Sequence, residues 1–90
     1  MTKEKILNVC SIYKRLFEYR NFGSERYHGD KLLNTYEDAF SHCNWMLPHL
    51  EEFAKEGRMD KAFRWLSFIQ GVLWVLRVFS INELKDHNRP

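Results

Sequence analysis

The sequence lacks both an excess of charge of one sign and a long hydrophobic run. Fourteen basic residues are nearly balanced by 12 acidic ones, for a net charge of +2, whereas nucleic-acid-binding domains usually show a basic stripe or a more extreme charge. The longest apolar segment, Trp65 to Phe79, has about 15 residues, and a bilayer span needs roughly 20. The charged opening Met1–Lys5 is not followed by a long apolar stretch, so no secretory signal is evident. We therefore expect a soluble, cytoplasmic protein with neither a membrane nor a nucleic acid as its partner.

The sequence also lacks the motifs of metal sites and of common active sites. It contains no CxxC, no HExxH and no glycine-rich phosphate loop. His42 and His49 would lie about 10.5 Å apart along a helix, too far to share a zinc ion whose ligands lie about 2 Å from it. Cys43 would point about 100° away from its neighbour His42, which disfavours a nucleophile–base pair. We expect no enzyme, no metal and no cofactor; a small nucleotide hydrolase without a known motif is the alternative.

Cysteine is scarce, with Cys10 and Cys43 the only two. Both fall on the apolar faces of predicted helices, as small buried thiols do in a reducing compartment. A disulfide or a metal role is the alternative.

The sequence is rich in apolar residues at helical spacing. One helix is predicted from about Lys3 to Tyr19, with Thr2 as its N-cap. After a loop from Arg20 to Gly29, a second helix is predicted to start from an N-cap at Asp30 and to stop at Gly57. A bend is expected in this helix because Pro48 removes one backbone donor.

A third helix is predicted from about Met59 to Phe79, and the short link at Gly57 makes it antiparallel to the second. Ser80 and Glu83 match the capping box S-x-x-E, which predicts a short fourth helix from Ile81 to about His87. A chain of 90 residues suits one domain. The sequence thus predicts a single all-α domain over residues 1–90: a small helical bundle of three main helices, with an antiparallel αα-hairpin of helices two and three.

The apolar residues of the third helix cover well over half of its circumference. A lone surface helix needs an apolar stripe of only about 100°, so this helix should be covered on several sides. The cover is expected from its own domain, from another copy of the chain, or from both, which predicts a homo-oligomer.

The remaining polar sector of the third helix holds the first set of candidate site residues. Guanidinium groups suit phosphates and indole faces suit nucleobases, so this sector could bind a nucleotide. Its members could instead be structural, with Arg64 paired to Asp60 one turn away and Trp74 covered by the first helix. The candidate ligand-binding residues are Arg64, Gln70, Trp74 and Arg77.

Trp45 anchors a second set, because it points away from the apolar stripe of its helix. Aromatic residues are enriched in protein interfaces and among their hot spots. A protein contact, packing against the long loop and plain exposure are the three possible reasons for its position. The candidate partner-binding residues are His42, Trp45 and His49 of this helix, and Arg26, Tyr27 and His28 of the loop.

The segment from Glu56 to Trp74, with Arg64-Trp65 at its centre, and the ending Asp86–Pro90 resemble a group of small uncharacterised accessory proteins of tailed bacteriophages and prophages. The resemblance covers about the last half of the chain and implies no activity. Phage accessory proteins of this size often bind and inhibit a host enzyme or a defence component. Arg64-Trp65 at the start of a long apolar helix is also similar to the helical, oligomeric phage sponges that sequester cyclic nucleotides of the anti-phage CBASS system.

We therefore expect a non-catalytic, phage-type accessory protein that inhibits or titrates a host or anti-phage defence protein. The alternative is an oligomeric sponge that sequesters a nucleotide second messenger.

Overall fold

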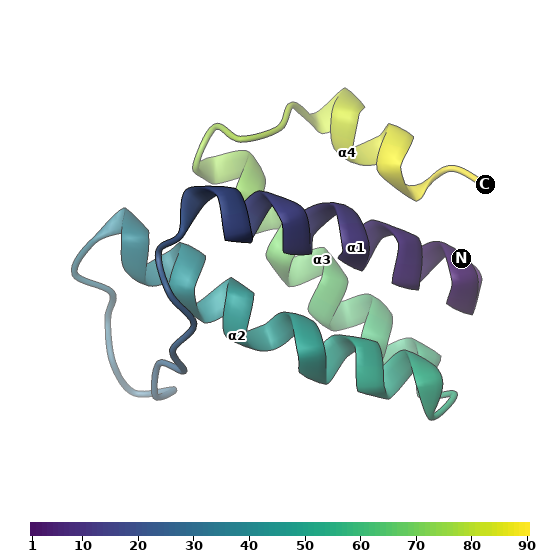
Figure 1. The fold of residues 1–90 in the computed structure, drawn as a ribbon, viewed down its shortest axis with the longest axis horizontal. Helices are drawn as coiled ribbons and strands as arrows, with labels where there is room; N and C mark the ends of the chain where they lie inside the picture. The colour runs from purple at the N-terminus through teal and green to yellow at the C-terminus, as the bar shows by residue number, and fades with distance from the viewer.

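The chain folds into four α-helices without a strand in a computed structural model that describes all of residues 1–90. Figure 1 shows that a tight turn joins α2 to α3 and that the two helices run antiparallel. The predicted all-α class, the αα-hairpin and the short fourth helix are confirmed. The helices are α1 (Lys3–Arg20), α2 (Tyr36–Lys55), α3 (Met59–Val75) and α4 (Ile81–Asn88).

Side-chain caps set the starts of three helices. Thr2 accepts the backbone N–H of Lys5 at 3.1 Å, and Ser80 and Glu83 form the predicted capping box. The predicted start of α2 at Asp30 is wrong, because Thr35 forms a capping box with Asp38. Such a box satisfies two of the unpaired N–H groups at a helix start. The residues before it, Leu32 and Leu33 among them, therefore belong to the loop.

Left-handed residues end α2 and α3. Gly57 has a φ of 80°, and the N–H of the next residue bonds to the carbonyl of Phe53 at 2.8 Å, as in a Schellman motif. The same pair of hydrogen bonds ends α3 around Arg77, whose φ is 64°. The predicted end of α3 at Phe79 is therefore wrong. Without a glycine at this position, the sequence carries no sign of the stop.

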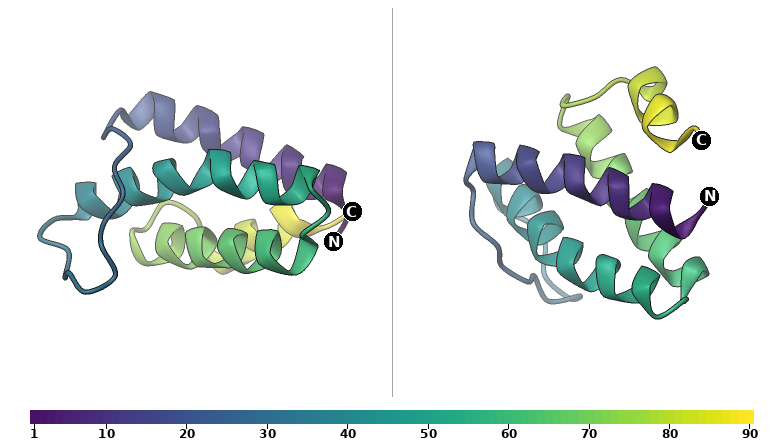
Figure 2. Two further views of the ribbon diagram at one scale, coloured as in Figure 1. Left: turned by 90° about the horizontal axis from the view of Figure 1, so that it is seen from below. Right: turned by 45° about the vertical axis from the view of Figure 1, so that its right-hand side comes forward.

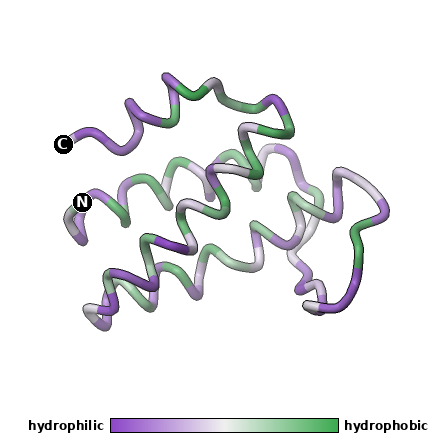
Figure 3. The backbone as a smooth tube through the Cα atoms, turned by 180° about the vertical axis from the view of Figure 1, so that it is seen from behind, coloured by the Kyte–Doolittle hydropathy of each residue, from purple (hydrophilic) through white to green (hydrophobic).

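The core lies where α1 packs against the α2–α3 hairpin. Fifteen apolar side chains form it, and the helical pattern of α2 continues through Pro48 as predicted. α4 packs on α1, on the side away from α2 (Figure 2). Seen from behind, α3 runs diagonally from the end of α2 to α4 (Figure 3). The helices thus cover one side of the hairpin and leave the outer side of α3 without a neighbour.

A polar network inside the fold joins α1, α3 and α4. Gln70 donates to the hydroxyl of Tyr13 at 3.0 Å and to Asn88 at 2.7 Å, and Asn88 donates back to Gln70 at 3.0 Å. Tyr13 is fully buried and its hydroxyl also bonds to Nδ1 of His87 at 2.8 Å. Gln70 is only 7% exposed, so its predicted place in an exposed polar sector is wrong. Its amide belongs to the interior because these partners, distant in sequence, satisfy it.

Arg77 provides a test of the backbone at the end of α3. A left-handed conformation costs a non-glycine residue roughly 1–2 kcal/mol. A glycine avoids this cost, but part of the gain in stability is lost because glycine raises the conformational entropy of the unfolded chain. We expect Arg77→Gly to raise the free energy of unfolding by about 0.5–1 kcal/mol, measured by urea denaturation.

Gly57→Ala is the matched control. Nothing lies within 4 Å of a Cβ at this position, so alanine there meets only the backbone cost and should lower the stability. If the Arg77→Gly protein is less stable than the wild type, the left-handed backbone at the end of α3 is not strained.

Candidate functional site

The loop of residues 21–35 is held along the N-terminal half of α2, which it crosses before it turns back (Figure 1). Asn44 donates to the carbonyl of Gly23 at 2.8 Å, and the N–H of Glu25 donates to the carbonyl of Ser41 at 3.2 Å. Further along, the N–H of Tyr27 donates to Nδ1 of His42 at 3.1 Å. The hydroxyl of Tyr27 donates to Asp38 at 2.6 Å. The loop therefore carries its side chains in fixed positions on α2.

Aromatic rings line the junction of this loop with α2 and α3, and we call this surface the aromatic seam. The ring centroids of Trp45 and His49 are 4.5 Å apart, those of Trp45 and Trp65 6.2 Å, and those of Trp65 and Phe53 4.9 Å. The seam continues through His42 toward the loop. Its rings belong to Tyr27, His42, Trp45, His49, Phe53 and Trp65.

Cationic side chains lie over this seam at both ends. The guanidinium carbon of Arg26 is 5.5 Å from the ring centroid of Trp45. That of Arg58 is 4.9 Å, and Nζ of Lys61 is 4.6 Å, from the centroid of Phe53. Such cation–π contacts fix the direction of the charged side chains while their ends stay in water.

The structure brings together five of the six residues predicted to bind a partner: Arg26, Tyr27, His42, Trp45 and His49. Trp45 packs against the loop through Arg26, which is one of the three possible reasons for its position, and its contact with a partner protein stays a prediction. His28 is exposed outside the seam, in a turn where its carbonyl accepts the N–H of Lys31. Phe53 and Trp65 were missed, although the tight turn at Gly57 indicates that residues on either side of it face each other across the hairpin.

The hydrogen bonds of the loop shift the acidity of the groups that make them. The bond from Tyr27 lowers the pKa of the Asp38 carboxyl, and the same bond raises the pKa of the Tyr27 phenol to about 12. Burial, and then the positive charge of Arg26, lower the pKa of His42 below its usual 6.5. At neutral pH His42 is therefore uncharged, as its acceptor role at Nδ1 requires.

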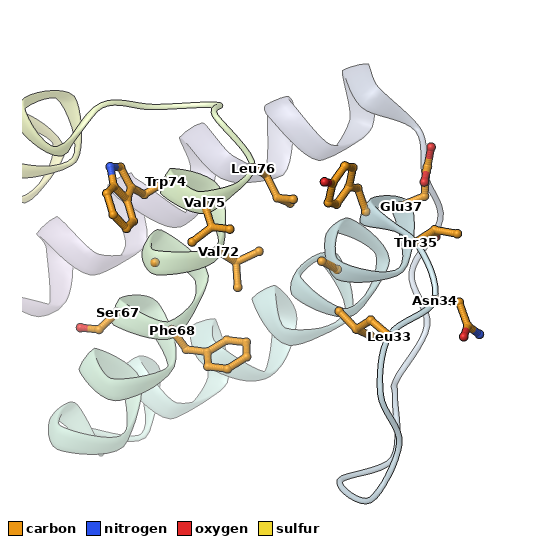
Figure 4. A pocket seen from close by; sticks show the side chains of 13 residues that line it. Leu33, Asn34, Thr35, Glu37, Ser67, Phe68, Val72, Trp74, Val75 and Leu76 are labelled. Atoms are coloured by element: carbon orange, nitrogen blue, oxygen red, sulfur yellow. The ribbon is translucent and has the colours of Figure 1, made fainter.

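An apolar hollow adjoins the seam, and we call it the apolar groove. It has a volume of about 1010 Å³ and lies between the start of α2 with its preceding loop and the C-terminal half of α3. In Figure 4, Phe68 and Val72 point from α3 into the gap that separates them from Leu33. Phe68 connects the two surfaces, because its ring centroid is 6.2 Å from that of His42. The apolar side chains that line the groove include Leu33, Tyr36, Phe68, Val72, Trp74, Val75 and Leu76.

The four residues predicted to bind a ligand do not converge. Gln70 is buried, and Arg64 is ten positions from Trp74, about 15 Å along the helix axis. Trp74 is half-exposed and lines the groove, and Arg77 is exposed beyond the end of α3. Arg64 lines a separate shallow depression with Arg58, Asp60 and Lys61. The expected Asp60–Arg64 ion pair does not form, and the one ion pair of the structure joins Asp86 and Arg89 at 2.8 Å.

The two thiols are buried and free, as the apolar positions of Cys10 and Cys43 indicate. Burial raises the pKa of each to about 12, so both are protonated and poor nucleophiles at neutral pH. The structure contains no group of three or more His, Cys, Asp and Glu side chains that could hold a metal ion. None of its helices combines the length and the apolar character needed to cross a bilayer.

His42 should release the loop in acid. A histidine whose folded-state pKa is lowered contributes stability that is present above 6.5 and is lost as the pH falls through the folded-state pKa. We expect the Tyr27 amide to be protected from hydrogen exchange at about pH 7.5 and to lose this protection, relative to the core helices, by about pH 5, as NMR would show.

His42→Ala should abolish the protection of the Tyr27 amide at both pH values. His49→Ala is the control, because His49 lies in the same seam and makes no hydrogen bond to the loop. A Tyr27 amide that keeps its protection in acid would contradict the role of His42.

Comparison with known proteins finds no relative for this chain. No protein-family model matches it, and neither a curated protein nor a solved structure does. The resemblance to phage accessory proteins therefore stays a prediction, and the two surfaces described above are the basis for a functional proposal.

Proposed function

We propose that this chain is a non-catalytic binding protein that inhibits or titrates another protein by covering part of its surface. The observation that carries the proposal is the aromatic seam, in which Arg26 of the loop, Trp45 of α2 and Trp65 of α3 come together. Tryptophan, tyrosine and arginine are the side chains that contribute most to the energy of protein interfaces.

The seam is a rigid surface, which favours its use in binding. Four hydrogen bonds hold residues 23–27 of the loop on α2, and ring–ring contacts join α2 to α3 along the seam. A partner that docks here does not have to order the loop. Such preorganisation strengthens binding because less conformational entropy is lost.

The chemistry of the seam indicates the kind of partner. Arg26, Arg58 and Lys61 surround flat aromatic rings, and His49 is exposed between them. Carboxylates satisfy the cations while apolar side chains cover the rings. The fitting partner is thus a protein surface on which acidic residues flank apolar ones.

Three groups that could perform nucleophilic or acid–base chemistry are engaged or buried: His42, Cys10 and Cys43. His42 accepts a backbone N–H, and both thiols are buried and protonated. These contacts support binding over catalysis. The resemblance of the C-terminal half to phage accessory proteins directs the search for the partner to host and defence proteins.

Charge reversal at the seam tests this proposal. The tagged chain would be used to capture partners from a bacterial lysate, and the captured protein would then be titrated by calorimetry. The double variant Arg26→Glu, His49→Glu changes two exposed side chains without touching the core. We expect it to raise the dissociation constant at least about 30-fold, the effect of losing roughly 2 kcal/mol at a hot spot.

Tyr19→Ala is the matched control, because Tyr19 is an exposed aromatic residue (87% exposed) at the end of α1, outside the seam. It should leave the affinity unchanged. If the double variant binds as tightly as the wild type while keeping its helical circular-dichroism spectrum, the seam is not the binding surface.

A further inference from the structure

Several large apolar side chains in and next to the apolar groove are exposed to solvent. Phe68 is 54%, Trp74 50% and Val75 67% exposed, and Leu32, in the loop that leads to the groove, is 91% exposed. Exposed apolar side chains that gather along a groove, as Phe68, Trp74 and Val75 do, usually mark an interaction site. No segment of the chain covers this one, because α1 and α4 pack on the other side of the fold.

The exposed area of the whole chain points to a missing cover. The 11.0 kDa chain exposes 6205 Å², whereas a typical monomer of this mass exposes about 5,600 Å². The chain thus exposes about 600 Å² more than such a monomer. A dimer interface that removed this excess area from both copies would bury about 1,200 Å², which is the lower end of the range for stable interfaces.

The charge pattern of α3 fits a second copy as the cover. No charged residue occurs between Arg64 and Arg77. In a symmetric dimer the same patch of both copies meets, with residues near the axis facing their own copies, where like charges would repel. This stretch of α3 can face itself without such a conflict, and its Phe68 and Val75 can fill the groove of a second chain.

Gly71 lies at the middle of the exposed face of α3. Glycine within a helix is unfavourable compared with alanine, and a Cβ at this position would meet no atom of the chain within 4 Å. Nothing in the single chain therefore requires glycine here. On a helical wheel Phe68 and Trp74 lie about 60° to either side of it, so the two large side chains border a dip in the helix surface.

We propose that the chain forms a symmetric dimer in which the α3 helices of two copies cross at Gly71 and each copy covers the apolar groove of the other. The missing side chain at Gly71 lets the two helix backbones approach closely, and the flanking Phe68 and Val75 enter the partner groove. The residues that line the groove are not those of the aromatic seam.

Sedimentation equilibrium of the full 90-residue chain tests the dimer. We expect the wild type to be dimeric at tens of micromolar. Gly71→Gln adds a bulky, helix-compatible side chain in open space, so it should keep the fold and raise the dimer dissociation constant at least about 30-fold. Val75→Lys places like charges near each other in the dimer and should have the same effect, stronger at low salt.

Ser11→Gln, on the exposed side of α1, is the control and should leave the dimer intact. A monomeric wild type at hundreds of micromolar overturns the proposal, as does a Gly71→Gln chain that stays dimeric. A monomer whose groove is filled by a different protein also overturns it. The seam variant Arg26→Glu, His49→Glu should remain dimeric, so failure of the dimer and failure of partner binding can be told apart.

Discussion

The carboxylate of Asp38 organises both surfaces of this protein. One of its oxygens accepts a hydrogen bond from the hydroxyl of Tyr27 at 2.6 Å. The other accepts hydrogen bonds from the backbone N–H groups of Asn34 and Thr35 at 3.1 and 3.2 Å. The backbone bonds fix the start of α2, which leaves Leu33 in the wall of the groove. The bond to Tyr27 holds the loop over His42 and so completes the aromatic seam. An ionised carboxylate accepts such bonds more strongly than a neutral group, so a single charge supports the geometry of the whole region.

The second constraint is the small size of the chain. Only 17 of its 90 residues are buried, because a domain of this length has a high ratio of surface to volume. α1 occupies one side of the hairpin. α4 packs on α1, where Tyr13 forms hydrogen bonds with His87 of α4 and Gln70 of α3. No element is left for the outer side of α3. The wide apolar arc of this helix is therefore divided between the core, which takes Leu66, Ile69 and Leu73, and the groove.

The parts of the fold that local chemistry decides could be predicted from the sequence. The capping box at Ser80 and the stop at Gly57 depend on residues within one turn, and both are confirmed. Other features depend on competition or on distant partners. Asp30 and Thr35 are both good N-cap residues, and the choice between them depends on the Tyr27 and backbone bonds of Asp38. Gln70 is polar yet buried because Tyr13 and Asn88 satisfy it, and no spacing along α3 reveals such partners.

The candidate surfaces show the same division. The sequence could indicate that Trp45 and the loop residues face outward, since these residues stand out from the helical pattern. It could not indicate the groove, because Leu33 and Tyr36 fit the apolar stripe of a longer α2 and Phe68 fits the arc of a fully covered α3. Only the later start of α2 turns these residues into the walls of a groove. An error of little more than one helical turn thus hid the groove.

The contact between Phe68 and His42 connects the groove to the seam. A chain that occupies the groove covers Phe68 and removes water from the neighbouring His42 ring. Burial already holds the pKa of His42 below its usual value, and further loss of water favours the neutral ring still more. The neutral ring is the form that accepts the N–H of Tyr27 and that does not repel the guanidinium of Arg26, which lies over Trp45. Occupation of the groove therefore stabilises the loop conformation of the seam, and by linkage a partner that stabilises this loop also favours occupation of the groove.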